Sequence, residues 1–160
     1  MIRKANLSDV RGIHALVNAF AARGGMLALS LSDLYDNVRD FIVASDRRGG
    51  TVLGCCALHV VWEDLAEIRS LAVVESAQRR GLGRRLVKRC LDEALVLGVR
   101  RAFALTYVPE FFARLGFHQV DKAELPHKVW ADCVKCPRFP DCDETAVILD
   151  LRNRKRPTAG

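Results

Sequence analysis

A β-rich segment, a turn with two glycines and a basic helix follow one another between residues 66 and 97, and this succession restricts the fold more than any other feature. The turn, residues 78–83, reads Gln-Arg-Arg-Gly-Leu-Gly. Glycines allow positive φ and close approach of a ligand to the backbone. The first N–H groups of the following helix, together with its dipole, attract an anion. The sequence therefore predicts a strand–turn–helix unit that binds phosphate.

The helix is predicted over residues 81–97. Its apolar stripe consists of Leu82, Leu86, Val87, Cys90, Leu91 and Ala94. Its polar face carries Arg84, Arg85, Lys88 and Arg89, and residues 76–91 contain no acid. The turn is not a Walker A loop, because no Gly-Lys-Ser/Thr follows, and its glycine spacing differs from that of dinucleotide-binding folds. The alternative to a phosphate site is a plain strand–helix turn with an exposed basic face.

The remaining pattern predicts an α+β domain in which helices pack on a mostly antiparallel sheet. Strands are expected at 1–5, 41–44, 51–62, 66–74, 101–106, 117–120 and 145–151, with a hairpin turn at Glu63-Asp64. A helix capped by Ser8 should end near Gly24-Gly25, and a second should be capped by Ser32-Asp33. A short helix is expected over 109–115, and residues 121–141 are expected to be irregular.

Length and charge indicate a single domain over 1–151 and a basic, disordered tail over 152–160. The net charge is +6, and four of these charges belong to the tail. The sequence shows neither a signal peptide nor a membrane-spanning run, so we expect a cytoplasmic protein with reduced thiols. Cys55, Cys56 and Cys90 are interpreted as small core residues.

The order Leu71-Ala72-Val73, the glycine turn and Phe111-Phe112-x-x-Leu115-Gly116-Phe117 resembles the GNAT superfamily of acetyltransferases across nearly the whole chain. This resemblance implies a mixed, mostly antiparallel sheet of six to seven strands with a splayed V between the fourth and fifth, and about four helices. It implies that acetyl-CoA is the acyl donor. The cofactor-binding residues are then Leu71, Ala72, Val73, Gln78, Arg79, Arg80, Gly81, Leu82, Gly83, Arg84 and Phe112.

Acetyl transfer to an amine requires that the ammonium lose a proton before it attacks. Glu67 stands in an otherwise apolar strand, four residues before Leu71, and the resemblance gives a glutamate there the role of general base. The alternative is that Glu67 only pairs with Arg69, and Glu63 is the reserve base. Many GNAT enzymes carry a tyrosine acid where this chain has Phe112. Tyr107 and Thr106 are the candidate acids here, although Tyr107 equally fits a core-covering aromatic.

Segments such as Trp62-Glu63-Asp64-Leu65-Ala66-Glu67 resemble the short form of the amino-acid N-acetyltransferases that make N-acetylglutamate, the first step of arginine biosynthesis. The implied reaction, in the EC 2.3.1 class, acetylates the α-amino group of an amino acid, with L-glutamate as the leading acceptor. Arg23, Arg69 and Arg138 are the candidate partners of the substrate carboxylates. In one departure, Leu29 stands where the family usually has an arginine.

Several alternatives remain open. The acceptor could be a protein N-terminus, a lysine or a small amine, and a non-catalytic acyl-CoA sensor is the rival of another class. Cys133, Cys136 and Cys142, with His127, resemble part of a zinc site, but three cysteines in a proline-containing loop favour packed thiols, so no metal is expected. The basic residues lack interleaved aromatics, so nucleic acid and membrane partners are not expected. A homodimer is possible.

Overall fold

In a computed structural model, residues 1–47, 50–126 and 143–154 can be described. They form a seven-stranded mixed sheet in the order β1-β2-β3-β4-β5-β7-β6. The strands are β1 (Ile2–Lys4), β2 (Phe41–Ser45), β3 (Val52–Trp62), β4 (Leu65–Val73), β5 (Arg101–Thr106), β6 (His118–Val120) and β7 (Thr145–Asp150). The helices are α1 (Val10–Ala21), α2 (Leu31–Asp36), α3 (Leu82–Leu97) and α4 (Pro109–Ala113). The predicted α+β architecture and the β3–β4 hairpin are confirmed.

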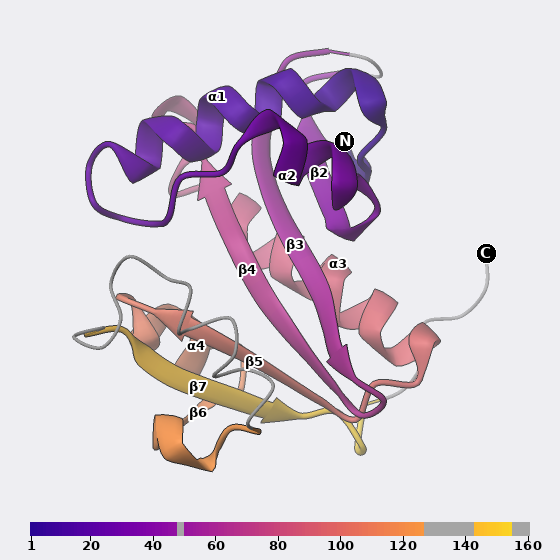
Figure 1. Cartoon of the computed structure of the whole chain (residues 1–160), viewed down its shortest axis with the longest axis vertical. Coiled ribbons are helices and arrows are strands. Elements are labelled where there is room, and N and C mark those ends of the chain that lie inside the picture. Colours follow the sequence, from indigo (N-terminus) through magenta and orange to yellow (C-terminus); the bar gives the residue numbers. More distant parts are fainter. Residues whose placement is uncertain (48–49, 127–142, 155–160) are drawn as a thin grey trace.

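The V between β4 and β5 is also confirmed. These two strands are the parallel pair of the sheet, and they are in register only from Leu65 opposite Arg101 to Glu67 opposite Phe103. Figure 1 shows them together near the β3–β4 turn and diverging toward their C-terminal ends. The divergence leaves the later part of β4 without a strand partner on that side. Its backbone polar groups there are available to a ligand, since buried N–H and C=O groups need partners.

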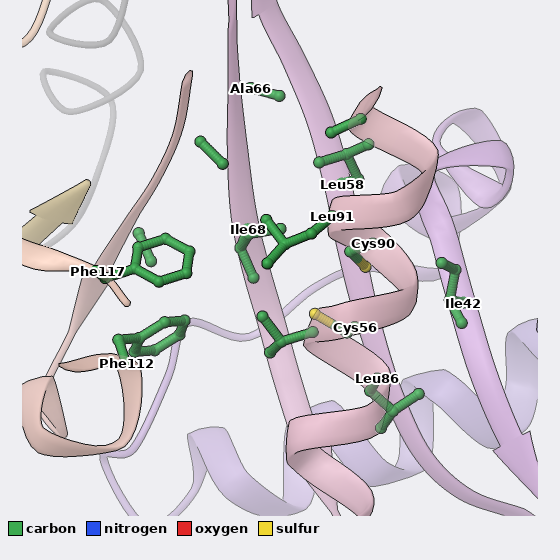
Figure 2. Close-up of a cluster of buried hydrophobic side chains, with 14 of the residues drawn as sticks. Ile42, Cys56, Leu58, Ala66, Ile68, Leu86, Cys90, Leu91, Phe112 and Phe117 are labelled. Atoms are coloured by element: carbon green, nitrogen blue, oxygen red, sulfur yellow. The ribbon is translucent and has the colours of Figure 1, made fainter. Parts of the chain in front are cut away.

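Helix α3 covers one face of the sheet with the apolar stripe predicted from the sequence. Leu86, Cys90 and Leu91 are fully buried, and Figure 2 shows them directed at strand residues such as Cys56 and Ile68. The basic side chains of α3 lie on its exposed side. Cys55, Cys56 and Cys90 are free, buried thiols, as expected. Their sulfurs fill space in the core, as small apolar groups would.

Helices α1 and α2 cover the opposite face, and the capping residues differ from those predicted. Ser8 was expected to cap the first helix, but Asn6 accepts the Ser8 N–H and forms a capping box with Asp9, starting a 3₁₀ turn that leads into α1. Ser30, not Ser32-Asp33, caps α2, again through a capping box, with Asp33. In both cases the cap is a polar residue three positions before an acid, and its side chain accepts one of the first free N–H groups of the turn. The apolar pattern alone did not identify these residues.

No helix in the described ranges combines the length and the apolar character needed to span a bilayer.

A 3₁₀ turn, η2 (Val38–Asp40), joins α2 to β2, and another, η3 (Glu75–Ala77), follows β4. Together η3 and the glycine turn lead from the C-terminal end of β4 into the start of α3. The phosphate-binding unit predicted from the sequence therefore lies beside the open end of the V.

Candidate active site

The glycine turn has the backbone conformation that an anion cradle requires. Gly81 is the N-cap of α3 with φ of 76°, and Arg79, two residues earlier, has φ of 64°. The Arg85 N–H is bonded to the Gly81 carbonyl, so the three N–H groups before it lie at the open end of the helix. Side-chain capping is absent at this end of α3. These N–H groups and the helix dipole face the space in front of the turn.

Side chains around the turn stabilise it and supply charge. The Gln78 amide donates to the Val73 carbonyl at 2.9 Å and so ties the turn to the end of β4. Arg79, Arg80 and Arg84 are exposed, as a site for a multiply charged ligand requires. A Cβ added to Gly83 would lie 3.6 Å from the Phe111 ring, an ordinary contact. Crowding within this chain therefore does not require a glycine at position 83.

Phe112, expected to contact the cofactor, lies in the core instead of at the surface of the turn. Its side chain is 4% exposed, and its ring packs edge-on against Phe111 and Phe117 at 5.2 Å between centroids. Figure 2 shows Phe112 and Phe117 together as part of the main core cluster. Such burial does not support a direct contact with a ligand. Phe111 is the ring that lies next to Gly83.

A β-bulge in β4 stands between the glycine turn and Glu67. The β3–β4 register passes from Cys55 opposite Ala72 to Ala57 opposite Arg69, which leaves one extra residue on β4. Ser70 takes up this residue with φ of 57°, and its carbonyl accepts a hydrogen bond from the Cys55 thiol at 3.4 Å. Left-handed φ at a residue other than glycine is strained and is concentrated at functional sites. The bulge redirects the backbone of Leu71–Val73, the segment expected to bind pantetheine.

Glu67 lies where the two arms of the V meet. Its side chain is 16% exposed, and Oε1 is 3.7 Å from Nη1 of Arg69. That separation is an ion pair but too long for a hydrogen bond. The pairing with Arg69 considered from the sequence is therefore present. It does not exclude a role as base, because the carboxylate is still partly exposed beside the opening of the V.

The candidate acids lie on the other arm. Counting four residues along each strand from the Glu67–Phe103 pair leads to Leu71 on β4 and to Tyr107 just beyond β5. Tyr107 is 40% exposed. The Thr106 hydroxyl is buried and accepts the Val108 N–H at 2.9 Å. Tyr107 is therefore the more accessible of the two, whereas Glu63 lies at the closed end of the V, in the hairpin turn.

The candidate carboxylate partners that the structure describes are Arg69 and Arg23. Arg69 is half-buried on β4, and Arg23 is exposed in the turn after α1. Leu29 packs in the same apolar cluster as Ala72 of β4. The side chain of Asn18 fixes its backbone, donating to the Leu29 carbonyl at 3.0 Å and accepting its N–H at 3.1 Å. Position 29 is thus held firmly against this cluster and the side chain of Asn18.

Several expected residues cannot be placed. Arg138, His127, Cys133, Cys136 and Cys142 all fall outside the described residues. Among the residues that are described, no group of three or more His, Cys, Asp or Glu side chains could hold a metal ion.

Two features of the site were missed from the sequence. One is the left-handed backbone conformation of Ser70, which a serine in the sequence does not indicate. The other is a hydrogen bond of 2.8 Å between His59 Nδ1 and Asp40 Oδ2, beside Glu67. A histidine inside an otherwise apolar strand was the available signal for it.

Comparison with known proteins agrees with this geometry. An uncharacterized N-acetyltransferase of Chlorobaculum tepidum is 39% identical over 150 residues, covering 94% of this chain and 96% of the relative. The amino-acid acetyltransferase of Mycobacterium tuberculosis is 40% identical over 131 residues, covering 81% and 75%. The amino-acid acetyltransferases of Neisseria meningitidis are 36% identical, but the match spans only 29% of their length.

Two solved structures share the fold at comparable identity. Rv2747 of Mycobacterium tuberculosis, in complex with CoA and NLQ, aligns with a TM-score of 0.81 at 34% identity, over 94% of this chain and 99% of that one. N-acetylglutamate synthase of Neisseria gonorrhoeae, complexed with coenzyme A and N-acetyl-glutamate, aligns with a TM-score of 0.85 at 31% identity, over 94% and 35%. Residues 17–117, more than half of the chain, match the Acetyltransferase (GNAT) family. With its splayed sheet, bulged fourth strand and glycine cradle, the chain belongs to the GNAT family of acetyltransferases.

Proposed function

We propose that this protein transfers the acetyl group of acetyl-CoA to the α-amino group of an amino acid, with L-glutamate as the leading acceptor. The observation that carries the proposal is the similarity, over four fifths of the chain, to the amino-acid acetyltransferase of Mycobacterium tuberculosis. The related structures that hold CoA support the choice of donor. The open N–H groups at the start of α3 suit the pyrophosphate, and the bulged end of β4 suits the pantetheine arm.

In the proposed reaction the amine attacks the thioester directly. Glu67 removes one proton from the substrate ammonium, and the free amine then attacks the acetyl carbonyl at the opening of the V. The C–S bond of the tetrahedral intermediate breaks, and CoA leaves as the thiolate. Tyr107, which is 40% exposed just beyond β5, donates its proton to that thiolate and takes the second proton of the nitrogen in return. A free backbone N–H of β4 beyond Glu67 suits the oxyanion.

A substrate panel scored by release of free thiol tests the acceptor. L-Glutamate, L-glutamine, L-aspartate and other amino acids are compared with N-terminal peptides, lysine peptides and polyamines. We expect turnover with an amino acid at the highest kcat/KM. Turnover with peptides or polyamines alone would instead make the protein a GNAT enzyme for other amines. Tight acetyl-CoA binding without turnover of any amine would make it an acyl-CoA sensor.

Position 29 tests how the acceptor is selected. Since Asn18 holds the Leu29 backbone, a longer side chain there should extend from a fixed point near β4. We expect Leu29→Arg to raise kcat/KM for glutamate relative to glutamine, because an arginine pairs with the extra carboxylate. Leu29→Met is the matched control of similar length without charge. An unchanged glutamate-to-glutamine ratio in Leu29→Arg would place position 29 outside the acceptor site.

Glu67→Gln tests the base. The amide keeps the size and polarity of the side chain but cannot accept the proton. We expect kcat to fall by about 100-fold or more, because positioned general bases contribute about 10² to 10⁴ in rate. The dissociation constant for acetyl-CoA should stay unchanged, as measured by thermal shift or calorimetry. Unchanged turnover would remove Glu67 from the mechanism and leave it as the ion-pair partner of Arg69.

A further inference from the structure

An acid, an imidazole and a second acid follow one another across η2, β3 and β4. Asp40 ends η2 directly before β2, His59 is on β3 and Glu67 is on β4. His59 Nδ1 lies 2.8 Å from Asp40 Oδ2, and His59 is the cross-strand partner of Glu67. Directly paired residues of antiparallel strands present their side chains on the same face, with Cβ atoms about 5 Å apart. His59 therefore lies between the two carboxylates.

The contact with Asp40 fixes the chemistry of the ring. A carboxylate only accepts hydrogen bonds, so the proton of the neutral imidazole sits on Nδ1. Nε2 is then the unprotonated, accepting nitrogen of the ring. The side chains of His59 and Asp40 are 29% and 27% exposed, so both reach water. This arrangement suits a group that accepts a proton on one side and releases it to solvent.

We propose that His59, oriented by Asp40, relays the proton that Glu67 removes from the substrate; the inference rests on the proposed function. Glu67 takes a proton from the ammonium and becomes a neutral acid. The proton passes from Glu67 to His59 Nε2, directly or through one water molecule, which restores the Glu67 carboxylate and forms an imidazolium. The imidazolium gives a proton to solvent. One proton thus leaves the site for each acetyl group transferred, and the second leaves with CoA as its thiol.

Charged groups of the neighbouring elements line the path that the proton would take from Glu67. Among the described residues, Asp40 from η2 and Glu67 and Arg69 from β4 are charged groups on its side of the sheet. Asp40 Oδ2 lies 2.8 Å from His59 Nδ1 and is placed to accept a hydrogen bond from that nitrogen. Arg69 Nη1 lies 3.7 Å from Glu67 Oε1 and forms an ion pair with the carboxylate that the relay restores. These groups therefore suit a path that leads the proton away from the amine.

His59→Asn tests the relay, because its amide nitrogen replaces Nδ1 as the donor to Asp40 while Nε2 is removed. The matched control is His118→Asn, at an exposed position on β6. For the acceptor with the highest wild-type activity, kcat is measured from pH 6 to pH 9, together with KM for acetyl-CoA. We expect kcat of His59→Asn to fall about tenfold at pH 7, with the deficit narrowing toward pH 9 as solvent base replaces the relay. KM for acetyl-CoA should stay within about twofold.

A second variant separates a relay from a structural role. In His59→Ala, added imidazole should restore kcat in proportion to its concentration, whereas it should not affect His118→Asn. Wild-type kcat at every pH in His59→Asn would overturn the relay. So would a loss that is equal at every pH and that imidazole does not restore. An inactive wild-type protein across the whole amine panel would refute the proposed function, and the relay with it. An active wild-type protein with an equally active His59→Asn would refute the relay alone.

Discussion

Gly81→Ala separates the conformational role of the glycine turn from its role in binding. A Cβ at this position would meet no heavy atom within 4 Å, so crowding contributes nothing. At φ of 76°, alanine costs about 1–2 kcal/mol relative to a right-handed conformation. The smaller entropy of the unfolded alanine chain returns about 0.4–1 kcal/mol. The net loss of stability is therefore about 1 kcal/mol, which for a chain of 160 residues lowers Tm by about 3 °C.

Gly98→Ala is the matched control for this loss. Gly98 follows the other end of α3, has φ of 90° and also has no heavy atom within 4 Å of an added Cβ. The two glycines are separated by a helix of 16 residues, about 24 Å long. Both variants should therefore lose similar stability. Only Gly81→Ala should weaken acetyl-CoA binding, because it disturbs the N–H groups that face the pyrophosphate.

The expected loss of acetyl-CoA affinity in Gly81→Ala follows from the hydrogen bonds to the pyrophosphate that the substitution would disturb. A hydrogen bond to a charged group is worth about 1.5–3 kcal/mol, so losing one raises Kd by about tenfold to a hundredfold. Calorimetry measures Kd directly, and thermal denaturation without ligand measures the stability loss. If Gly81→Ala lost stability like Gly98→Ala but bound acetyl-CoA as tightly as wild type, the turn would not be the phosphate cradle. If it lost no stability, the left-handed conformation of Gly81 would be wrong.

Two further predictions concern the stability of the fold. Arg3 holds the buried Asp9 carboxylate with bonds of 2.7 and 2.9 Å and lowers its pKa. Asp9→Asn should therefore cost about 2 kcal/mol near pH 7 in urea denaturation. The gap from wild type should begin to narrow below about pH 4, where Asp9 of the unfolded chain becomes protonated, and should close at lower pH, where Asp9 of the folded protein is protonated as well; a gap that did not change with pH would contradict this linkage. Burial raises the pKa of the Cys55 thiol to about 12. Peptide mapping after iodoacetamide treatment at pH 8 should find Cys55 unlabelled in the native protein and labelled in urea, and rapid native labelling would show that this core opens.

Helices and strands whose positions are set by their own residues were predicted well. The stripe from Leu82 to Ala94 has the helical period, and Gly81 and Gly98 mark the ends of α3, so this helix could be placed to within a residue. The caps of α1 and α2 were misplaced because several polar residues compete at each start. Only tertiary packing decides whether Asn6 or Ser8 points back at the helix. Phe111 and Phe112 could not be distinguished either, since which of two adjacent rings is buried depends on how α4 packs.

The bulge at Ser70 explains why the middle of the site was the hardest part to predict. A bulge is a relation between two strands, the extra residue that β4 has relative to β3, and neither strand signals it in its own residues. Yet it sets the relation between the two halves of the site. Before the bulge, β4 is held in register with both neighbours, which fixes Glu67 beside His59 and Phe103. Beyond it, β4 has left β5 and presents its free edge next to the glycine turn. Ser70 thus lies between the part of β4 that holds the proposed base, Glu67, and the part that exposes its backbone to the proposed cofactor. One strand can serve both purposes because the bulge at Ser70 separates these two parts.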